Sequence, residues 1–274
     1  MGLASLPIGS SNERLTPDLT IVVPTYNERH NLDTLLGDLF VACAQHHIVC
    51  EVIVVDDDSS DGTGAHADTW TAKAPVRVIH RSGKLGLGSA VMEGFAAATS
   101  DIVGVIDADL SHPPHLVGTL YATMMNNDLE MVVASRYAAG GGTGEWAIGR
   151  KALSRLGCAL TRGLTPVRDA MSGYFLIRRR CLTGLTTSSR GFKIGLELLV
   201  RTAPRRVAEV GYVFVERAEG ESKMTMSEGL IFLRQLVSLY TESRSRSLTR
   251  PFYLAVTPPL SLPYGAPAPE TPRA

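Results

Sequence analysis

Short apolar runs alternate with helix-like segments along the first half of the chain. The runs are rich in β-branched residues and lie near residues 19–24, 51–56, 76–80, 102–107 and 131–135. The segments between them, 30–46, 60–73, 87–99 and 113–126, have helical character. Continuous apolar strands that alternate with helices are typical of a parallel sheet covered on both faces. We therefore predict an α/β fold.

The pattern changes after residue 136. Residues 137–146 are glycine-rich and predict a loop, and residues 148–164 carry their apolar side chains on one helical face. Two further strands are predicted at 172–182 and 207–217.

The chain is predicted to form one domain over residues 19–243. A disordered leader over 1–18 precedes it, and a basic, then proline-rich tail over 244–274 follows it. The last 24 residues hold seven prolines, a composition typical of disordered chain.

The bulk composition excludes several classes of protein. Lys+Arg and Asp+Glu both number 27, so the formal net charge is zero and a globally basic nucleic-acid-binding protein is not expected. The four cysteines form no CxxC pair, which disfavours a zinc site or a disulfide framework and suits a reducing compartment. No run of about 18 apolar residues occurs, so no ordinary transmembrane helix is predicted.

Two carboxylates end the fourth apolar run. Asp107 and Asp109 are separated by a single alanine, and residues two apart in an extended chain point the same way. Ligands bind at the carboxyl ends of the strands in such sheets, and paired carboxylates hold hard divalent cations such as Mg²⁺ or Mn²⁺. The pair is therefore a candidate site for a cation that bridges to a substrate diphosphate. Two ordinary surface acids are the alternative.

Two other strand ends carry candidate nucleotide contacts. In the segment 22–29, VVPTYNER, Tyr26 can stack on a flat ring, and an ordinary turn capped by Asn27 is the alternative. The segment 54–63, VVDDDSSDGT, places three acids in a row, which repel one another unless a positive or hydrogen-bonding group faces them. One of these acids can accept a hydrogen bond from a nucleotide's ring N–H or ribose hydroxyls. A solvated acidic turn is the alternative.

Basic residues suited to phosphate occur later in the chain. They are Arg136, Arg150, Arg217 and Lys223, and solvated surface charge is the alternative for each. The segment 83–90, GKLGLGSA, is not a GxGxxG motif and does not follow the first strand, which argues against a dinucleotide-dependent oxidoreductase.

Taken in chain order, these motifs resemble those of the family-2 glycosyltransferases of the GT-A fold, in the branch of the dolichol-phosphate (polyprenol-phosphate) mannose synthases. The matching pieces cover roughly residues 20–240. They are VVPTYNER, VVDDDSSDGT, GLGSAVMEGF, DADLSHPP, SRY, Arg150 with Ser154, SGYFLIRR, GFKIGLELL and GESKM. The resemblance implies a Rossmann-like mixed sheet with helices on both faces and a bound Mg²⁺ or Mn²⁺.

The resemblance also implies a role for each matching residue. The nucleotide's base and ribose would be held by Pro24, Tyr26, Glu28, Val55, Asp56, Asp57 and Ala108. The metal-binding DxD motif would be Asp107 and Asp109, with Ser111 standing where family members often have glutamine. The donor phosphates or sugar would meet Arg136, Lys193, Arg217 and Lys223. The lipid phosphate would be bound by Arg150 and Ser154.

The reaction implied is inverting transfer of mannose from GDP-mannose to a polyprenyl (dolichyl) phosphate. A polyprenyl-phosphate glucosyltransferase that uses UDP-glucose is the alternative within the class, and a non-catalytic nucleotide-sugar or lipid-phosphate binding module is the alternative outside it. The acceptor phosphate is already largely ionised near neutral pH, so a dedicated base is dispensable. Glu197 is interpreted as an orienting or structural acid, and a general base is the alternative.

A lipid acceptor requires contact with a membrane surface. The candidate is the helix 148–164, which can lie in the interface with its apolar face towards the bilayer, and the segment 229–240 is a second candidate. Packing of these faces on the sheet, or an anchoring partner subunit, is the alternative. We expect a peripheral protein on the cytoplasmic face of a membrane.

Overall fold

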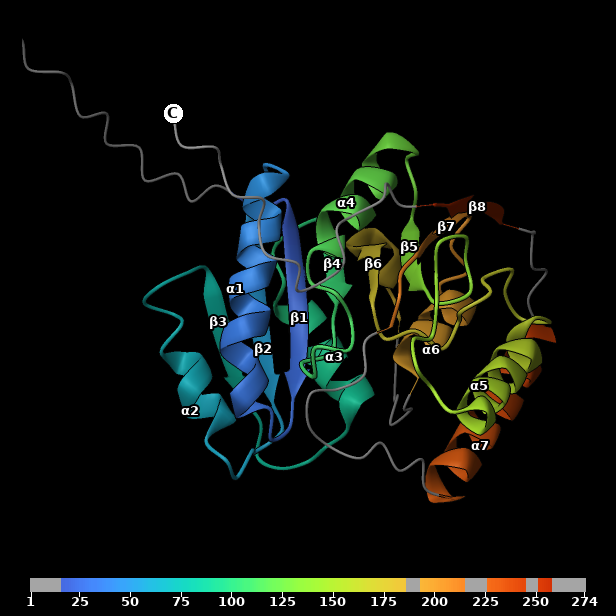
Figure 1. Cartoon of the computed structure of the whole chain (residues 1–274), viewed down its shortest axis with the longest axis horizontal. Coiled ribbons are helices and arrows are strands. Elements are labelled where there is room, and N and C mark those ends of the chain that lie inside the picture. The colour runs from blue at the N-terminus through green and yellow to red at the C-terminus, as the bar shows by residue number, and fades with distance from the viewer. Residues whose placement is uncertain (1–15, 186–192, 215–225, 245–250, 258–274) are drawn as a thin grey trace, which may run out of the picture.

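The structure is a computed structural model that describes residues 16–185, 193–214, 226–244 and 251–257. Its centre is an eight-stranded sheet with strand order β3-β2-β1-β4-β6-β5-β7-β8 (Figure 1). The strands are β1 (Leu19–Thr25), β2 (Cys50–Asp56), β3 (Val76–His80), β4 (Ile102–Val105), β5 (Met131–Ser135), β6 (Phe175–Arg178), β7 (Arg206–Gly211) and β8 (Phe252–Val256).

The sheet is mixed. β6 runs antiparallel to both of its neighbours, β4 and β5, and the remaining pairs are parallel. The prediction of an α/β fold with a mixed sheet is confirmed. Because β6 is reversed, its amino end lies at the edge where the parallel strands end, and the loop before it reaches that edge.

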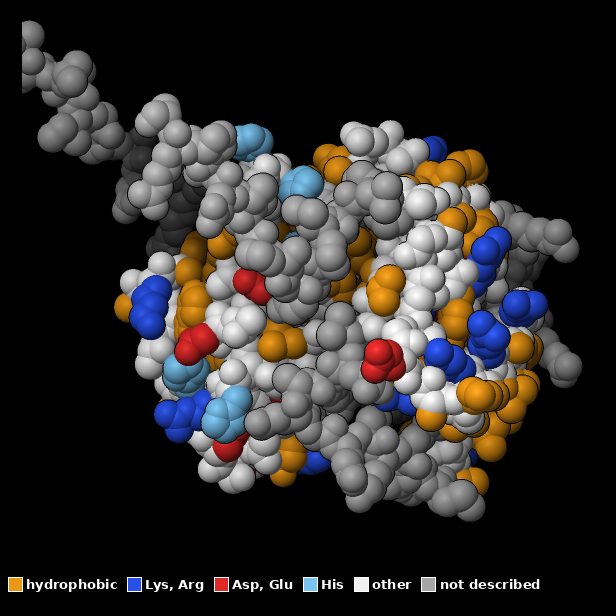
Figure 2. Space-filling model, viewed as in Figure 1, with side chains coloured by type: hydrophobic (Ala, Val, Ile, Leu, Met, Phe, Trp, Pro, Cys, Tyr) orange, Lys and Arg blue, Asp and Glu red, His pale blue; other side chains and the backbone are white. Residues whose placement is uncertain are grey.

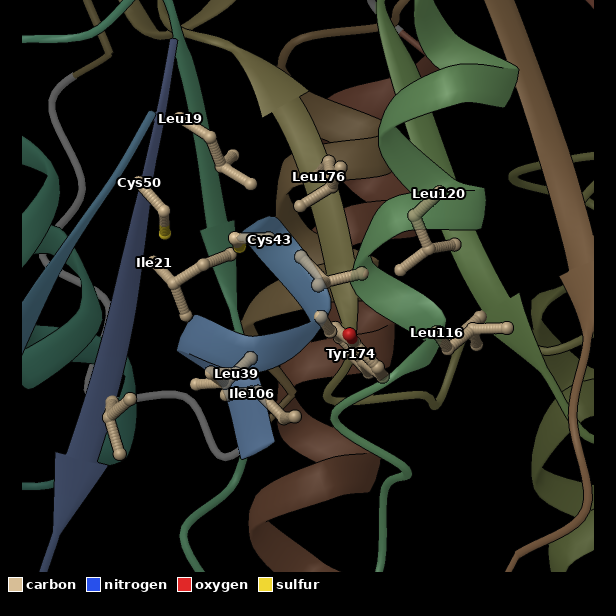
Figure 3. Packing of buried hydrophobic residues seen from close by; sticks show 14 of the residues in the cluster. Leu19, Ile21, Leu39, Cys43, Cys50, Ile106, Leu116, Leu120, Tyr174 and Leu176 are labelled. Atoms are coloured by element: carbon tan, nitrogen blue, oxygen red, sulfur yellow. The ribbon is translucent and has the colours of Figure 1, made fainter. Parts of the chain in front are cut away.

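Helices cover both faces of the sheet. They are α1 (Arg29–Gln45), α2 (Thr63–Asp68), α3 (Leu87–Ala97), α4 (Leu116–Asn126), α5 (Ile148–Thr161), α6 (Ile194–Arg201) and α7 (Met226–Arg244). One core cluster joins α1, α2 and α4 to the sheet and is shown in part in Figure 3. The other joins α3, α6 and α7 to the opposite face. The strands read as continuous apolar runs because both of their faces are buried, as in all seven residues of β1.

The predicted tail is wrong for residues 252–256. This segment forms β8, which pairs in parallel with β7 from Arg206 to Val210. The backbone of β7 would otherwise be an open sheet edge, and Leu254 and Val256 pack against the first core cluster. The domain therefore extends past the predicted boundary at residue 243.

Three other predicted elements differ in extent. The helix expected over 60–73 is limited to α2, because the turn before it is fixed by side-chain hydrogen bonds. Of the strand expected over 172–182, only Phe175–Arg178 forms a strand, β6. The next four residues form a 3₁₀ helix, Arg179–Leu182. The strand expected over 207–217 is β7, and its last predicted residues lie outside the described ones.

Candidate active site

The turns after β1 and β2 are joined by side-chain hydrogen bonds. The backbone N–H of Asn27 donates to the hydroxyl of Ser59 over 2.9 Å, and the side-chain oxygen of Asn27 accepts from the backbone N–H of Ser60 over 3.0 Å. Asn27 has a left-handed backbone, φ 58°, which asparagine tolerates better than most residues. It thus joins the two turns instead of capping α1.

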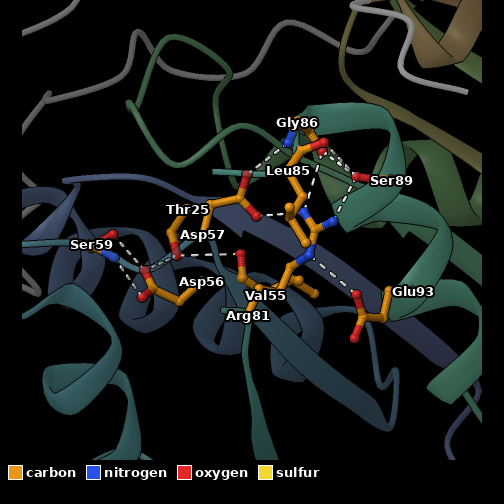
Figure 4. A network of polar contacts seen from close by, with 10 residues as sticks. All are labelled: Thr25, Val55, Asp56, Asp57, Ser59, Arg81, Leu85, Gly86, Ser89 and Glu93. Carbon is orange, nitrogen blue, oxygen red and sulfur yellow. Dashed lines mark hydrogen bonds and ion pairs between the residues drawn. The ribbon is translucent and has the colours of Figure 1, made fainter. Parts of the chain in front are cut away.

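Two of the three consecutive acids at the end of β2, Asp56 and Asp57, have different partners (Figure 4). Asp56 accepts hydrogen bonds from the hydroxyls of Thr25, over 3.0 Å, and Ser59, over 2.6 Å. Asp57 forms a buried ion pair with Arg81 and accepts from the backbone N–H of Gly86 over 3.0 Å. The predicted positive and hydrogen-bonding partners of this acidic cluster are therefore present, and Asp57 fixes the loop before α3.

Tyr26 presents an aromatic surface beside these turns. Its side chain is 41% exposed, and the Nζ atom of Lys84 lies 3.9 Å from the centre of its ring. Glu28 is partly buried and directly precedes α1, and its backbone N–H donates to the hydroxyl of Thr63 over 2.9 Å.

Three other predicted nucleotide contacts belong to the core. Pro24 and Val55 are register partners in β1 and β2, and Ala108 follows β4; all three are buried. The structure thus brings the predicted nucleotide residues to one edge of the sheet.

The DxD motif follows β4, which pairs with β1, and so lies at the same edge of the sheet. Asp107 is partly exposed, whereas Asp109 is buried and accepts from the backbone N–H of Ser111 over 3.0 Å. The loop before β6 passes directly over this pair, because a Cβ atom placed on Gly173 would lie 2.7 Å from an oxygen of Asp107. Only glycine leaves that oxygen room.

His112 lies beside the DxD motif. Its Nδ1 atom lies 3.5 Å from Asp107, and its ring packs among those of Tyr174, Tyr212 and Phe214. Burial lowers the pKa of His112, while the nearby charges of Asp107 and Asp109 oppose that shift. The charges of both carboxylates therefore act on this one ring, and their convergence on a shared cation stays a prediction. Sequence analysis gave His112 no role.

Arg136 follows β5 and is held by a buried acid. Its Nε and Nη2 atoms donate to the two carboxylate oxygens of Asp169 over 2.7 and 2.6 Å, and its backbone N–H donates to the same group over 2.8 Å. Burial by itself lowers the pKa of Arg136, but the hydrogen bonds and charge of Asp169 raise it above its ordinary value. Arg136 is thus permanently charged and fixed in orientation.

Arg136 and Arg150 lie on the same aromatic surface. Arg150, in the first turn of α5, lies 4.0 Å from the centre of the Trp146 ring, and Arg136 lies 5.3 Å from it. Both also lie within 6 Å of the ring of Phe214, at 5.9 and 5.7 Å. The structure therefore groups Arg136 with the predicted lipid-phosphate residue.

Two further predicted residues are Ser154, on α5 with Arg150, and Lys193, directly before α6. The hydroxyl of Tyr137 donates to Ser154 over 2.7 Å, which ties α5 to the loop after β5. Burial lowers the pKa of Lys193 and the charge of Arg136 lowers it further, whereas Asp107 and Asp169 raise it. Lys193 is therefore near both the DxD motif and Arg136.

The sequence predictions for the site differ in outcome. Arg217 and Lys223 lie outside the described residues. Ser111 lies beside the DxD motif, with its hydroxyl 3.5 Å from His112, and its role as a metal ligand stays a prediction. Asp169 and Trp146 were missed. An isolated acid and an isolated tryptophan carry no spacing that marks them in a sequence.

The apolar face of α5 is exposed and does not pack on the sheet. Ile148, Leu153, Leu156 and Leu160 are 86%, 49%, 56% and 40% exposed. On the neighbouring helix α7, Leu230, Ile231, Leu233 and Val237 are exposed too. Figure 2 shows hydrophobic side chains gathered over this edge of the molecule, with Lys and Arg side chains beside them. We call these eight side chains the α5–α7 patch.

No described helix combines the length and apolar character that a membrane crossing requires. Patches this apolar on a monomer mark contact surfaces.

This fold, with carboxylates and cations gathered at one edge of the sheet, fits a glycosyltransferase. The sequence matches the profile of glycosyl transferase family 2 over residues 20–196, and the chain belongs to that family. Solved structures share the fold. A mannosyltransferase from Pyrobaculum calidifontis, in complex with GDP-Man and Mn²⁺, is 19% identical with a TM-score of 0.61, covering 87% of this chain and 67% of that one. Glucosyl-3-phosphoglycerate synthase from Mycobacterium tuberculosis, in complex with Mn²⁺, UDP-glucose and phosphoglyceric acid, is 22% identical with a TM-score of 0.61, covering 84% and 80%.

The curated relatives identify the branch. A dolichol-phosphate mannosyltransferase from Pyrococcus furiosus is 36% identical over 81% of this chain, which spans 63% of that protein's length. The dolichol-phosphate mannosyltransferase of Saccharomyces cerevisiae is also 36% identical, over 81% of this chain and 87% of its own. The polyprenol monophosphomannose synthase of Mycolicibacterium smegmatis is 36% identical over 78% and 83%. The predicted resemblance and GT-A fold are confirmed.

Proposed function

We propose that the protein transfers mannose from GDP-mannose to a polyprenyl phosphate with inversion at the anomeric carbon. One observation carries the proposal. Arg136 and Arg150 both lie over the ring of Trp146, near the start of α5, whose apolar face is exposed. Two fixed guanidinium groups suit a phosphate dianion, and the exposed leucines beside them suit its hydrocarbon chain. The names of the relatives support mannose and a dolichol or polyprenol phosphate, and the mannosyltransferase that shares the fold was solved with GDP-Man.

Asp107 and Asp109 fit a divalent cation. Their oxygens are hard donors, and Gly173 leaves space over the partly exposed Asp107. Among the described residues no group of three or more His, Cys, Asp or Glu side chains is placed to hold a metal. When bound, Mg²⁺ or Mn²⁺ would neutralise charge on the departing diphosphate.

The side chains would act mainly by positioning and charge. The turns after β1 and β2, with Tyr26, Glu28 and Asp56, would receive the nucleoside. Lys193, together with Arg217 and Lys223, would meet the donor phosphates. Arg136, which the resemblance assigned to the donor, shares the Trp146 surface with Arg150, and the two would hold the acceptor phosphate. The oxygen of that phosphate is already ionised and needs no base to attack.

Glu197 is structural in this reading. It is buried in α6 and forms an ion pair of 2.7 Å with Arg201, one turn later. Its second oxygen accepts from Gln235 on α7 over 3.3 Å. It thereby joins α6 to α7 behind the site.

The α5–α7 patch would place the site at a membrane. Because Arg150 and Ser154 are on α5 itself, contact of its leucines with a bilayer would bring the acceptor phosphate to the site at headgroup depth. We propose peripheral attachment to the cytoplasmic face. An anchoring partner subunit on the same patch is the alternative.

A donor panel tests the proposed reaction. Labelled GDP-mannose, UDP-glucose and UDP-N-acetylglucosamine are each incubated with a polyprenyl phosphate, with and without Mn²⁺. Of the three donors, we expect only GDP-mannose to support transfer, and only in the presence of Mn²⁺. Preferential transfer from UDP-glucose would show that UDP-glucose is the donor, and no transfer from any of the three would contradict the proposal.

Lys193 should limit activity at alkaline pH. Because its pKa is lowered, its charge is lost as pH rises and at a lower pH than that of an ordinary lysine. The KM for GDP-mannose should therefore rise on the alkaline side. Lys193→Arg should move this rise to higher pH, because guanidinium does not titrate there. The measurement is KM against pH for wild type, Lys193→Arg and the surface control Lys73→Arg, and identical profiles for all three would contradict the assignment.

A further inference from the structure

Asp169, the acid that holds Arg136, has no exposed surface. It is located in the loop between α5 and β6, and all three of its bonds to Arg136 depend on where that loop lies. Something must therefore fix the loop against the sheet.

Glu209 fixes it. This residue is at the middle of β7 and is also fully buried. Its Oε2 atom accepts from the backbone N–H of Arg168 over 2.8 Å, and its Oε1 atom accepts from the backbone N–H of Asp169 over 2.9 Å. One carboxylate thus holds two consecutive amides, which sets both the position and the direction of the loop at Asp169.

The C-terminal strand completes this arrangement. The hydroxyl of Tyr253, on β8, donates to Oε2 of Glu209. Burial raises the pKa of Tyr253 and so does its hydrogen bond to Glu209, so the hydroxyl stays protonated and remains a donor. A continuous series of polar contacts therefore runs from β8 through Glu209 and Asp169 to Arg136.

We infer that Glu209 and Asp169 are positioning residues that hold Arg136 against Trp146 in the orientation that binds the acceptor phosphate, and that Tyr253 supports Glu209. Two fully buried carboxylates are costly to a core that needs only packing, whereas they hold a guanidinium group in one geometry. The assignment to the acceptor phosphate rests on the proposed function. The positioning of Arg136 does not.

The test uses Trp146 as a reporter. The chain has two tryptophans, so Trp70→Phe leaves Trp146 as the only source of tryptophan emission. In this background, the side chain of Glu209→Gln has a single oxygen to accept from the backbone N–H groups of Arg168 and Asp169. Its NH₂ group would face the other N–H, and two donors form no hydrogen bond. We expect a changed Trp146 emission, an acceptor KM raised by about tenfold and a GDP affinity within about twofold of the parent. Asp169→Asn should act in the same direction.

Two further variants make the result decisive. Tyr253→Phe keeps the carboxylate and removes only its hydroxyl partner, so it decides the matter if Glu209→Gln does not fold; we expect about a threefold rise in acceptor KM. Glu130→Gln is the matched control, because Glu130 also accepts from a backbone N–H, that of Arg205, just before β7 begins. It should change neither emission nor acceptor KM.

Unchanged Trp146 emission and acceptor KM in folded Glu209→Gln or Tyr253→Phe would overturn the inference. So would an equal loss of GDP affinity, which indicates a merely structural role. If the wild type transfers nothing to a polyprenyl phosphate, the proposed function fails, and the Trp146 emission still decides whether Glu209 positions Arg136.

Discussion

Asp109→Asn is expected to lower the rate of mannosyl transfer by about a thousandfold or more, because a bound divalent cation contributes several kcal/mol of charge stabilisation. The substitution keeps the shape of the side chain and its acceptor for the N–H of Ser111, so the fold should persist. The measurements are the transfer rate and, separately, the affinity for Mn²⁺ in the presence of GDP by calorimetry. Both should be lost together.

Asp101→Asn is the matched control for this variant. Asp101 precedes β4 at the strand's other end, and its side chain is almost fully exposed, 4.0 Å from Arg179. Removing its charge should change neither the rate nor the Mn²⁺ affinity. Full wild-type activity in EDTA would show that the DxD motif does not act through a metal.

Replacing Leu153, Leu156 and Leu160 by Ser is expected to abolish binding to anionic vesicles. All three are exposed on α5, and burying one leucine side chain in an apolar phase is worth about 2 kcal/mol. The test is flotation of the purified chain with vesicles that contain an anionic lipid. Because these side chains do not support the core, the variant should still bind GDP.

A second triple variant controls for the general effect of three serines. Val41, Val49 and Met125 are similarly exposed but lie away from the α5–α7 patch, on α1, the loop before β2 and α4. Their replacement by Ser should leave flotation unchanged. If the α5 variant floats like the wild type, this helix is not the membrane contact.

The sequence was a good guide wherever local pattern decides structure. The continuous apolar runs predicted the buried strands, and the position of Asp107 and Asp109 directly after the fourth run placed the DxD motif after β4. The exposed stripe on α5 was also visible as a helical pattern, although only the structure shows that the sheet does not cover it.

What the sequence could not predict depends on contacts between distant residues. Arg81 neutralises Asp57 from 24 positions away, and Asp169 binds Arg136 from 33 positions away. Strand β8 was missed because the prolines after it dominate the composition of the last segment, whereas its pairing depends on an edge that β7 provides. No local pattern marks such partners.

The order of strands separates an earlier from a later length of chain. The strands β3, β2, β1 and β4 come from residues 19–105 and include those that end in the turns proposed to receive the nucleoside, while β6, β5, β7 and β8 come from later residues, which carry the groups proposed for the acceptor phosphate and also Lys193, proposed for the donor phosphates. The DxD motif follows β4, at the seam between them. Under the proposed roles, substitutions confined to α5 and the loop after β5 would change the acceptor site and leave the nucleoside turns as they are.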